Sequence, residues 1–130
     1  MVKTCVNLCG TKIDNPVIPA SGTFGYGREF AELYDINCLG TFSFKGTTLA
    51  PRAGNAQPRI AEFAGGMLNA VGLQNPGVDA VIAHELPRLR EIFRKPVMAN
   101  VSGFSPEEYV EVCRLPYDHA AEGIHIRHSL

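Results

Sequence analysis

Short apolar runs alternate with segments of helical spacing along most of the chain. Three runs predict strands of the kind that a parallel sheet buries on both faces: residues 17–20, 38–44 and 96–101. Helical spacing follows each run, over residues 28–34, 78–93 and 106–113. This alternation predicts an α/β fold with a parallel sheet, and both a doubly wound sheet and a piece of a (β/α)8 barrel fit it.

Two hairpins are predicted outside this series. Residues 4–13 turn near Gly10 and form a short hairpin at the amino terminus. Residues 47–76 are long and loop-like, and we expect a second hairpin within them, pairing 59–63 with 67–70. A connection of this length inside a compact domain is usually functional or carries local structure of its own.

Proline, serine and histidine residues in the later part of the chain mark where helices break, begin and end. Pro87 interrupts the second helical segment, and Ser105 before Pro106 is typical of a helix start. From Arg114 the helical stripe is lost, and three of the four histidines (119, 125 and 128) lie in this tail without a supporting carboxylate pattern. We therefore divide the chain into a domain at 1–113 and a divergent tail at 114–130, interpreted as a truncation or frameshift, and predict no metal site.

Composition narrows the class of protein. The chain is 45% hydrophobic and 19% charged with a formal net charge of −1, which is typical of a globular protein. No basic stripe indicates nucleic acid, and no apolar segment approaches the roughly 18 residues of a membrane span. We expect a cytoplasmic protein. The cysteines lack a CxxC pair, and Cys5 and Cys9 are interpreted as two packed thiols on one face of the first hairpin.

Candidate chemistry lies where the predicted strands end, because ligands of parallel α/β proteins bind at the carboxyl ends of strands. The first strand is followed by Ala20, Ser21 and Gly22, which are either a ligand-facing loop or an ordinary glycine-rich turn. The second ends at Lys45 and Gly46, which either meet an anion or form a solvated rim. The third carries Asn100, whose amide can face a heterocycle or fix a loop.

Three longer stretches carry a resemblance to a known family. They are NPVIPASGTFGYGREF (15–30), FKGTTLAPRAGNAQPRIAEFAGGMLNAVGLQNPG (44–77) and PVMANVSGFSPEEY (96–109). Together they resemble the N-terminal half of class 1 dihydroorotate dehydrogenases, over about residues 3–113. The motif LNAVGLQN (68–75) is similar to that of the catalytic subunit of the NAD-linked, two-subunit form.

The resemblance implies a fold and a set of binding residues. The fold would be the N-terminal portion of a (β/α)8 TIM barrel with an N-terminal β-hairpin. The implied FMN-binding residues are Ala20, Ser21, Gly22, Lys45, Gly46 and Asn100. The implied substrate-binding residues are Lys45, Asn69, Ala70, Val71, Gly72 and Leu73.

The resemblance also implies a reaction, the oxidation of dihydroorotate to orotate in pyrimidine biosynthesis. The family's catalytic cysteine belongs to an N-x-S-C-P-N loop that this sequence lacks, and Cys113 lies in a predicted helix, so we expect the chain to be inactive alone. A partner subunit would carry FAD, an iron–sulfur cluster and the NAD site. Two alternatives stay open: a non-catalytic binding or assembly half-barrel, and an FMN barrel of the dihydropyrimidine dehydrogenase kind.

Overall fold

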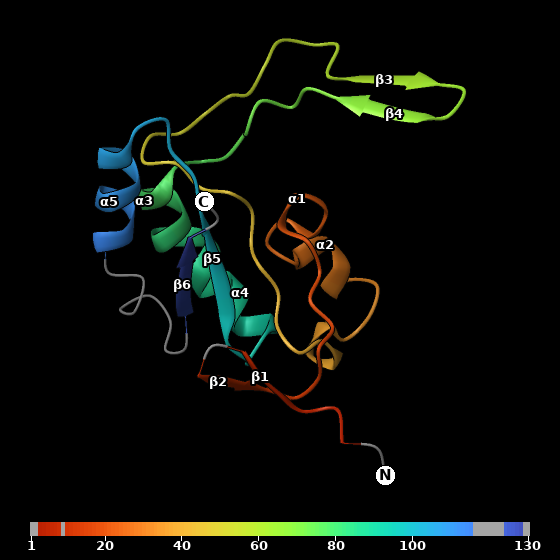
Figure 1. Cartoon of the computed structure of the whole chain (residues 1–130), viewed down its shortest axis with the longest axis vertical. Helices are drawn as coiled ribbons and strands as arrows, with labels where there is room; N and C mark the ends of the chain where they lie inside the picture. Colours follow the sequence, from red (N-terminus) through yellow and green to blue (C-terminus); the bar gives the residue numbers. More distant parts are fainter. Residues whose placement is uncertain (1–2, 9, 116–123, 129–130) are drawn as a thin grey trace.

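The computed structural model describes residues 3–8, 10–115 and 124–128. The chain opens with the predicted hairpin, in which β1 (Val6–Leu8) pairs antiparallel with β2 (Thr11–Ile13). Figure 1 shows this hairpin beneath the body of the molecule. Gly10 in the turn has φ +89°, a conformation that glycine adopts without steric cost. Cys9 lies outside the described residues, so the prediction about its packing beside Cys5 stays a prediction.

The strand predicted at 17–20 is wrong. These residues form no strand, and Val17 is 55% exposed where a central strand would be buried. Two prolines explain the difference, because neither Pro16 nor Pro19 has an N–H group to donate to a ladder. The segment keeps one long-range backbone bond, from the Gly40 N–H to the Val17 carbonyl (3.1 Å).

The glycine-rich segment after it is more helical than predicted. Its first residues form the short helix α1 (Ser21–Phe24), which ends at Gly25 with φ +58°. The next helix, α2 (Arg28–Ala31), is shorter than the predicted 28–34, although Tyr34 still donates its N–H to the Phe30 carbonyl. Only part of the predicted apolar stripe is covered, because Leu33 is 79% exposed.

The second predicted strand forms only in its later part. Its first residues lie in the 3-10 helix η1 (Ile36–Cys38), which Asp35 caps by accepting the Asn37 N–H. Residues 42–47 then run parallel to β5 (Val97–Val101). The Phe44 N–H donates to the Met98 carbonyl (3.1 Å), and the Met98 N–H donates to the Phe42 carbonyl (3.0 Å). The predicted parallel pairing of these two segments is confirmed.

β5 lies at the centre of the parallel arrangement. On its other edge it pairs with β6 (Ile124–His128), with Val97 opposite Ile124 and Val101 opposite His128. The tail from Arg114 therefore contains a strand that the sequence pattern did not predict. Its interpretation as a divergent segment stays a prediction, and His119 lies outside the described residues.

The long connection contains the second predicted hairpin. β3 (Ile60–Phe63) pairs antiparallel with β4 (Gly66–Asn69), as expected from the sequence. Figure 1 shows this hairpin as an arm that projects away from the body. All of its strand residues are exposed, and four of them are large and apolar: Ile60, Phe63, Met67 and Leu68.

The second helical segment is continuous through Pro87. It consists of α3 (Val78–Ala80), the π-helical turn η2 (Val81–Glu85) and α4 (Leu86–Ile92). The wider π turn ends two residues before Pro87, which cannot donate to a carbonyl four residues back, and the helix continues through the proline. The last helix, α5 (Pro106–Arg114), begins as predicted, with the Ser105 hydroxyl accepting the Glu108 N–H (3.3 Å).

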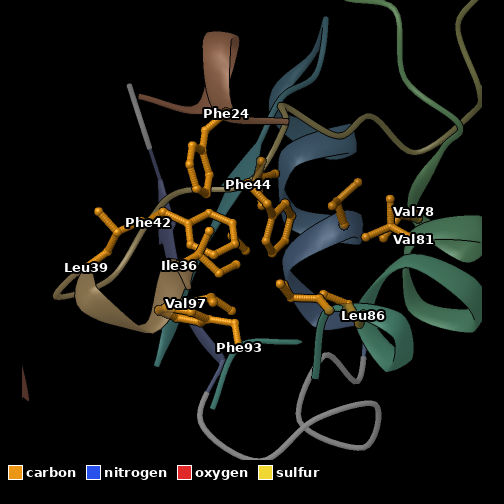
Figure 2. Packing of buried hydrophobic residues seen from close by; sticks show 14 residues of the cluster. Phe24, Ile36, Leu39, Phe42, Phe44, Val78, Val81, Leu86, Phe93 and Val97 are labelled. Atoms are coloured by element: carbon orange, nitrogen blue, oxygen red, sulfur yellow. The ribbon is translucent and has the colours of Figure 1, made fainter. Parts of the chain in front are cut away.

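The core lies between the parallel segments and the helices (Figure 2). Phe42 and Phe44 are fully buried, and Phe42 packs edge-on against Phe24 and Phe93 at ring-centroid distances of 4.8 and 5.1 Å. Each such side chain contributes about 1.5–3 kcal/mol by leaving water. This aromatic cluster therefore fixes the register in which residues 42–47 lie against β5.

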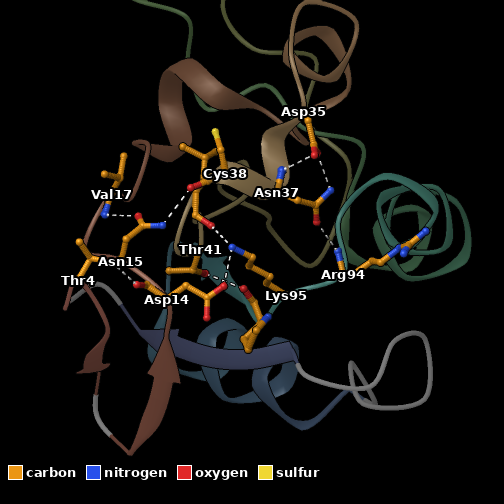
Figure 3. A network of polar contacts seen from close by, with 12 residues as sticks. Thr4, Asp14, Asn15, Val17, Asp35, Asn37, Cys38, Thr41, Arg94 and Lys95 are labelled. Atoms are coloured by element: carbon orange, nitrogen blue, oxygen red, sulfur yellow. Dashed lines mark hydrogen bonds and ion pairs between the residues drawn. The ribbon is translucent and has the colours of Figure 1, made fainter. Parts of the chain in front are cut away.

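A polar network joins the amino-terminal hairpin to the body at the starts of the parallel segments (Figure 3). Lys95 binds the Asp14 carboxylate (2.8 Å) and donates to the Leu39 carbonyl (2.9 Å). Thr41 donates to the Pro96 carbonyl (2.7 Å) just before β5. The carboxyl ends of the same segments lie at the opposite edge and are free to position a ligand site. Within the described residues, none of the helices has the length and apolar character needed to cross a membrane.

Candidate functional site

Two of the predicted site segments meet through a side-chain hydrogen bond. The Asn100 amide, near the end of β5, donates to the Ser21 hydroxyl at the start of α1 (2.8 Å), across 79 residues of sequence. Ser21 is therefore placed beside the strand end by an amide that also belongs to the predicted site. The structure therefore brings together the loop after residues 17–20, which form no strand, and the end of β5.

Lys45 and Gly46 lie at the same edge. The Lys45 N–H donates to the Gly25 carbonyl (2.9 Å), which ties the end of the second parallel segment to the loop after α1. Gly46 is buried, and a Cβ atom placed on it would lie 3.1 Å from Leu73 Cδ1 and 3.4 Å from Asn100 Nδ2. The absence of a side chain at this position allows Leu73 and Asn100 to approach the backbone closely.

The Ala20–Gly22 segment offers free space beside this edge. The Ala20 carbonyl accepts the N–H groups of Thr23 (3.2 Å) and Phe24 (3.0 Å), which holds α1 in place. A Cβ atom on Gly22 would meet nothing within 4 Å. Gly22 therefore presents open backbone next to a hydroxyl and an amide, an arrangement that suits a flat, polar ligand.

The predicted substrate segment is only partly at this edge. Asn69 is the last residue of β4, paired with Ile60, and both Asn69 and Ala70 are exposed at the base of the arm. The chain then turns through Gly72 (φ +79°) and Leu73 (φ 55°). Leu73, at the end of this segment, packs on Gly46.

Asn75 was not singled out as a site residue, yet it anchors this segment. It is 5% exposed, and its side-chain oxygen accepts the N–H groups of Thr48 (3.1 Å) and Gly77 (3.0 Å). Its amide donates to the Leu73 carbonyl (2.9 Å). The asparagine–proline pair at 75–76 is a turn signal that could have indicated this role.

Asn55 and Arg59 were also given no role, although both lie in the stretch 44–77 that resembles the family. The Asn55 amide donates to the Ala70 carbonyl (2.9 Å), and Arg59 donates to the Gln74 side chain (2.7 Å). Both residues therefore contact the segment that contains Leu73. No local pattern reveals this, because the contacts span 15 residues and depend on the path of the arm.

The electrostatics near the core do not favour an activated nucleophile in α5. Burial raises the pKa of the Cys113 thiol above its ordinary value, so Cys113 stays protonated near neutral pH. Burial also raises the pKa of Tyr26, and the nearby Thr47 hydroxyl only partly opposes this. Among the residues that the structure describes, no group of three or more His, Cys, Asp or Glu side chains could hold a metal ion.

The chain matches a known family over most of its length. The model of the family described as dihydroorotate dehydrogenase matches residues 3–125. The catalytic subunit of dihydroorotate dehydrogenase B (NAD(+)) from Cutibacterium acnes is 53% identical over 116 residues, covering 88% of this chain and 38% of that protein. The subunit of the same name from Bacillus pumilus is 56% identical over 107 residues, covering 82% of this chain and 34% of that protein.

Solved structures give the same fold. A ligand-free dihydroorotate dehydrogenase from Eimeria tenella matches 95% of this chain and 37% of its own, with a TM-score of 0.68 and 21% identity. The same enzyme in complex with ferulenol matches with a TM-score of 0.63 and 22% identity. The predicted fold, an α/β chain forming part of a (β/α)8 barrel, is confirmed. This chain spans well under half the length of these relatives, and it belongs to the dihydroorotate dehydrogenase family.

Proposed function

We propose that this chain supplies part of an FMN- and pyrimidine-binding site in a dihydroorotate dehydrogenase. FMN is the cofactor of this family, and the residues that would hold it are Ala20, Ser21, Gly22, Lys45, Gly46 and Asn100. The observation that carries the proposal is the Asn100–Ser21 hydrogen bond beside the buried Gly46. It gathers residues from three separate segments at one edge of the parallel arrangement.

The chemistry of these residues fits a flavin. The open backbone at Gly22 leaves room for a flat ring, while Ser21 and Asn100 can exchange hydrogen bonds with its polar edge. The Lys45 ammonium is a cation suited to stabilising negative charge on a reduced ring. When bound, FMN would accept the hydride that leaves the substrate.

The substrate part of the proposal assigns dihydroorotate and orotate to Lys45 and to residues 69–73. Lys45 would pair with the carboxylate of the substrate, and the Asn69 amide would meet the polar edge of the pyrimidine. Oxidation of the ring removes a proton from one carbon and a hydride from its neighbour. We assign no base for the proton to this chain, because Cys113 lies in α5 and its pKa is raised by burial. Activity would then belong to a longer protein.

A partner subunit is part of the same proposal. The relatives are named catalytic subunits of an NAD(+)-linked enzyme, and a second subunit carrying FAD, an iron–sulfur cluster and the NAD site would take electrons from FMN. The cytoplasmic location expected from the sequence is also proposed here.

Titration of FMN into the 130-residue chain, followed by flavin fluorescence and absorbance, tests the binding site. We expect retained flavin, and Gly22→Ala should weaken binding by about tenfold or more because the added methyl group takes space that the ring needs. Gly65→Ala in the arm is the matched control, since a Cβ atom there meets only the Phe63 ring at 3.4 Å. A folded chain that retains no flavin, or a Gly22→Ala variant with unchanged affinity, contradicts the proposal.

One observation favours the alternative of an assembly module, namely the four large apolar side chains exposed on the arm. Gel filtration of the chain in the presence of FMN distinguishes the assembly module from the flavin-binding site. A defined oligomer that retains no flavin favours assembly, whereas a flavin-retaining species favours the binding site.

A further inference from the structure

The turn that ends the predicted substrate segment is held in an uncommon conformation. Gly72 has φ +79°, and Leu73 follows with φ 55° although it carries a side chain. A non-glycine residue in this region costs about 1 kcal/mol or more, and it persists only where neighbouring groups determine it. The groups that hold this turn therefore decide whether its shape exists before a ligand arrives.

Asn55 holds one side of the turn. Its backbone N–H donates to the Val71 carbonyl (3.0 Å), and its side-chain amide donates to the Ala70 carbonyl (2.9 Å). A Cβ atom on Gly72 would lie 2.7 Å from Asn55 Cγ, so the Gly72 backbone lies directly against the Asn55 side chain. On the other side of the turn, the Asn75 side-chain amide donates a hydrogen bond to the Leu73 carbonyl oxygen.

Arg59 links Asn55 to Gln74, the last residue of the turn. Its guanidinium donates to the carbonyl oxygens of Asn55 and Ala53 and to the Gln74 side-chain oxygen (2.7 Å). A planar guanidinium with three acceptors has little freedom, so it holds its partners in one geometry. Asn55 and Arg59 thus form a clamp on residues 70–74.

The hydrogen bonds around the turn occupy most of its backbone carbonyl oxygens and leave most of its backbone N–H groups without acceptors in the described residues. The carbonyl oxygens of Ala70, Val71 and Leu73 are all engaged. Within the described part of the chain, the N–H groups of residues 71–74 donate to no other group. A backbone turn with more free N–H groups than free carbonyls favours a ligand rich in acceptors, such as a planar heterocycle with carbonyl and carboxylate oxygens.

We propose that Asn55 and Arg59 are positioning residues that preset the 70–74 turn for an acceptor-rich, anionic pyrimidine. This inference rests on the proposed function, because it takes orotate as the ligand of the turn. Neither residue needs to touch the ligand. Losing the clamp lets the strained turn relax, and binding must then restore its shape, which lowers affinity.

The test measures orotate binding and FMN binding separately on the full chain. Orotate is titrated into ¹⁵N-labelled protein while the amide signals of residues 69–74 are followed, and FMN affinity is measured by fluorescence. We expect Asn55→Ala and Gln74→Ala to lower orotate affinity by about three- to tenfold, the effect of roughly one hydrogen bond, with FMN affinity unchanged. Gln74→Glu keeps an acceptor for Arg59 and should retain the affinity. Glu62→Gln, on the exposed arm, is the control.

The outcomes separate this inference from the proposed flavin site. Wild-type orotate affinity in Asn55→Ala and Gln74→Ala overturns the clamp, as does a wild-type chain whose 69–74 signals do not respond to orotate. A loss in Gln74→Glu equal to that in Gln74→Ala also overturns it. Failure of the wild type to bind FMN contradicts the flavin site, while the orotate titration still decides the clamp.

Discussion

Gly40 lies against the backbone of the amino-terminal segment more closely than any side chain allows. A Cβ atom on Gly40 would lie 1.9 Å from the Asn15 carbonyl oxygen and 2.9 Å from its carbon, where real Cβ contacts essentially never fall below 3.0 Å. The obstacle is backbone, which cannot rotate away as the end of a flexible side chain can. Gly40→Ala therefore forces the two segments apart.

The cost follows from what this separation disturbs. Overpacking of a well-packed site typically costs about 1–3 kcal/mol. Moving Asn15 also strains the bond from its amide to the Cys38 carbonyl (2.9 Å) and the bond from the Gly40 N–H to Val17 (3.1 Å). Each hydrogen bond contributes about 0.5–1.5 kcal/mol. We expect Gly40→Ala to lower the free energy of unfolding by about 2–5 kcal/mol.

Urea unfolding followed by circular dichroism measures this difference. Gly22→Ala is the matched control, because it is the same substitution at a position with no atom within 4 Å, and it should leave stability unchanged or raise it by up to about 1 kcal/mol. A free energy of unfolding for Gly40→Ala within about 0.5 kcal/mol of the wild-type value would refute this expectation, because such a difference is typical of harmless surface substitutions.

Three further predictions concern stability. Asn75→Ala leaves two buried backbone N–H groups without their acceptor and should cost about 2–4 kcal/mol in urea unfolding; a loss below about 0.5 kcal/mol would contradict this expectation. The hydrogen bond and ion pair with Lys95 lower the pKa of Asp14, so their stabilisation is present above the unfolded-state pKa of about 4 and is lost as the pH falls through the lowered value. Thermal melts from pH 6 to 3 should show a shallower decline for Asp14→Asn than for the wild type, and identical profiles would count against it. Phe42→Ala should cost about 3–5 kcal/mol, whereas Leu33→Ala, at 79% exposed, should change unfolding little; comparable losses would show that burial is misassigned.

Elements with strong local signals were predictable from the sequence. The hairpin at Gly10 and the start of α5 at Ser105 depend on residues whose backbone preferences are local. β5 was predictable from its short apolar run. In the structure this run has neighbours on both edges, and its residues are buried at alternate positions. The run at 17–20 has similar hydrophobicity, but Pro19 within it and Pro16 before it have no N–H group to donate to a ladder, and a hydrophobicity pattern does not show a missing donor.

The candidate site was predictable in its parts and not in its assembly. Loops after predicted strands indicated Ser21, Lys45 and Asn100. Parallel segments bring their carboxyl ends to one edge, which accounts for Lys45 and Asn100, whereas the residues before Ser21 form no strand. The packing of Leu73 on Gly46 depends on the route of the arm between them, which no local pattern specifies. The roles of Asn55 and Asn75 are hidden for the same reason, since each holds a backbone distant in sequence.

The two ends of the parallel segments differ in how completely their polar groups are used. At the amino ends, Lys95, Thr41 and Asn15 are engaged with backbone or carboxylate partners that tie the first hairpin to the body. At the carboxyl ends, the 70–74 turn keeps N–H donors without protein acceptors in the described residues, and Leu73 retains backbone strain. Satisfied groups stabilise a fold, whereas unused donors and strain are features of sites that bind ligands. Variants at the two ends should therefore differ in the property that they change. Gly40→Ala should lower stability, whereas Gly22→Ala should weaken flavin binding. If both variants changed both properties together, the division of the molecule into a stabilising end and a binding end would be wrong.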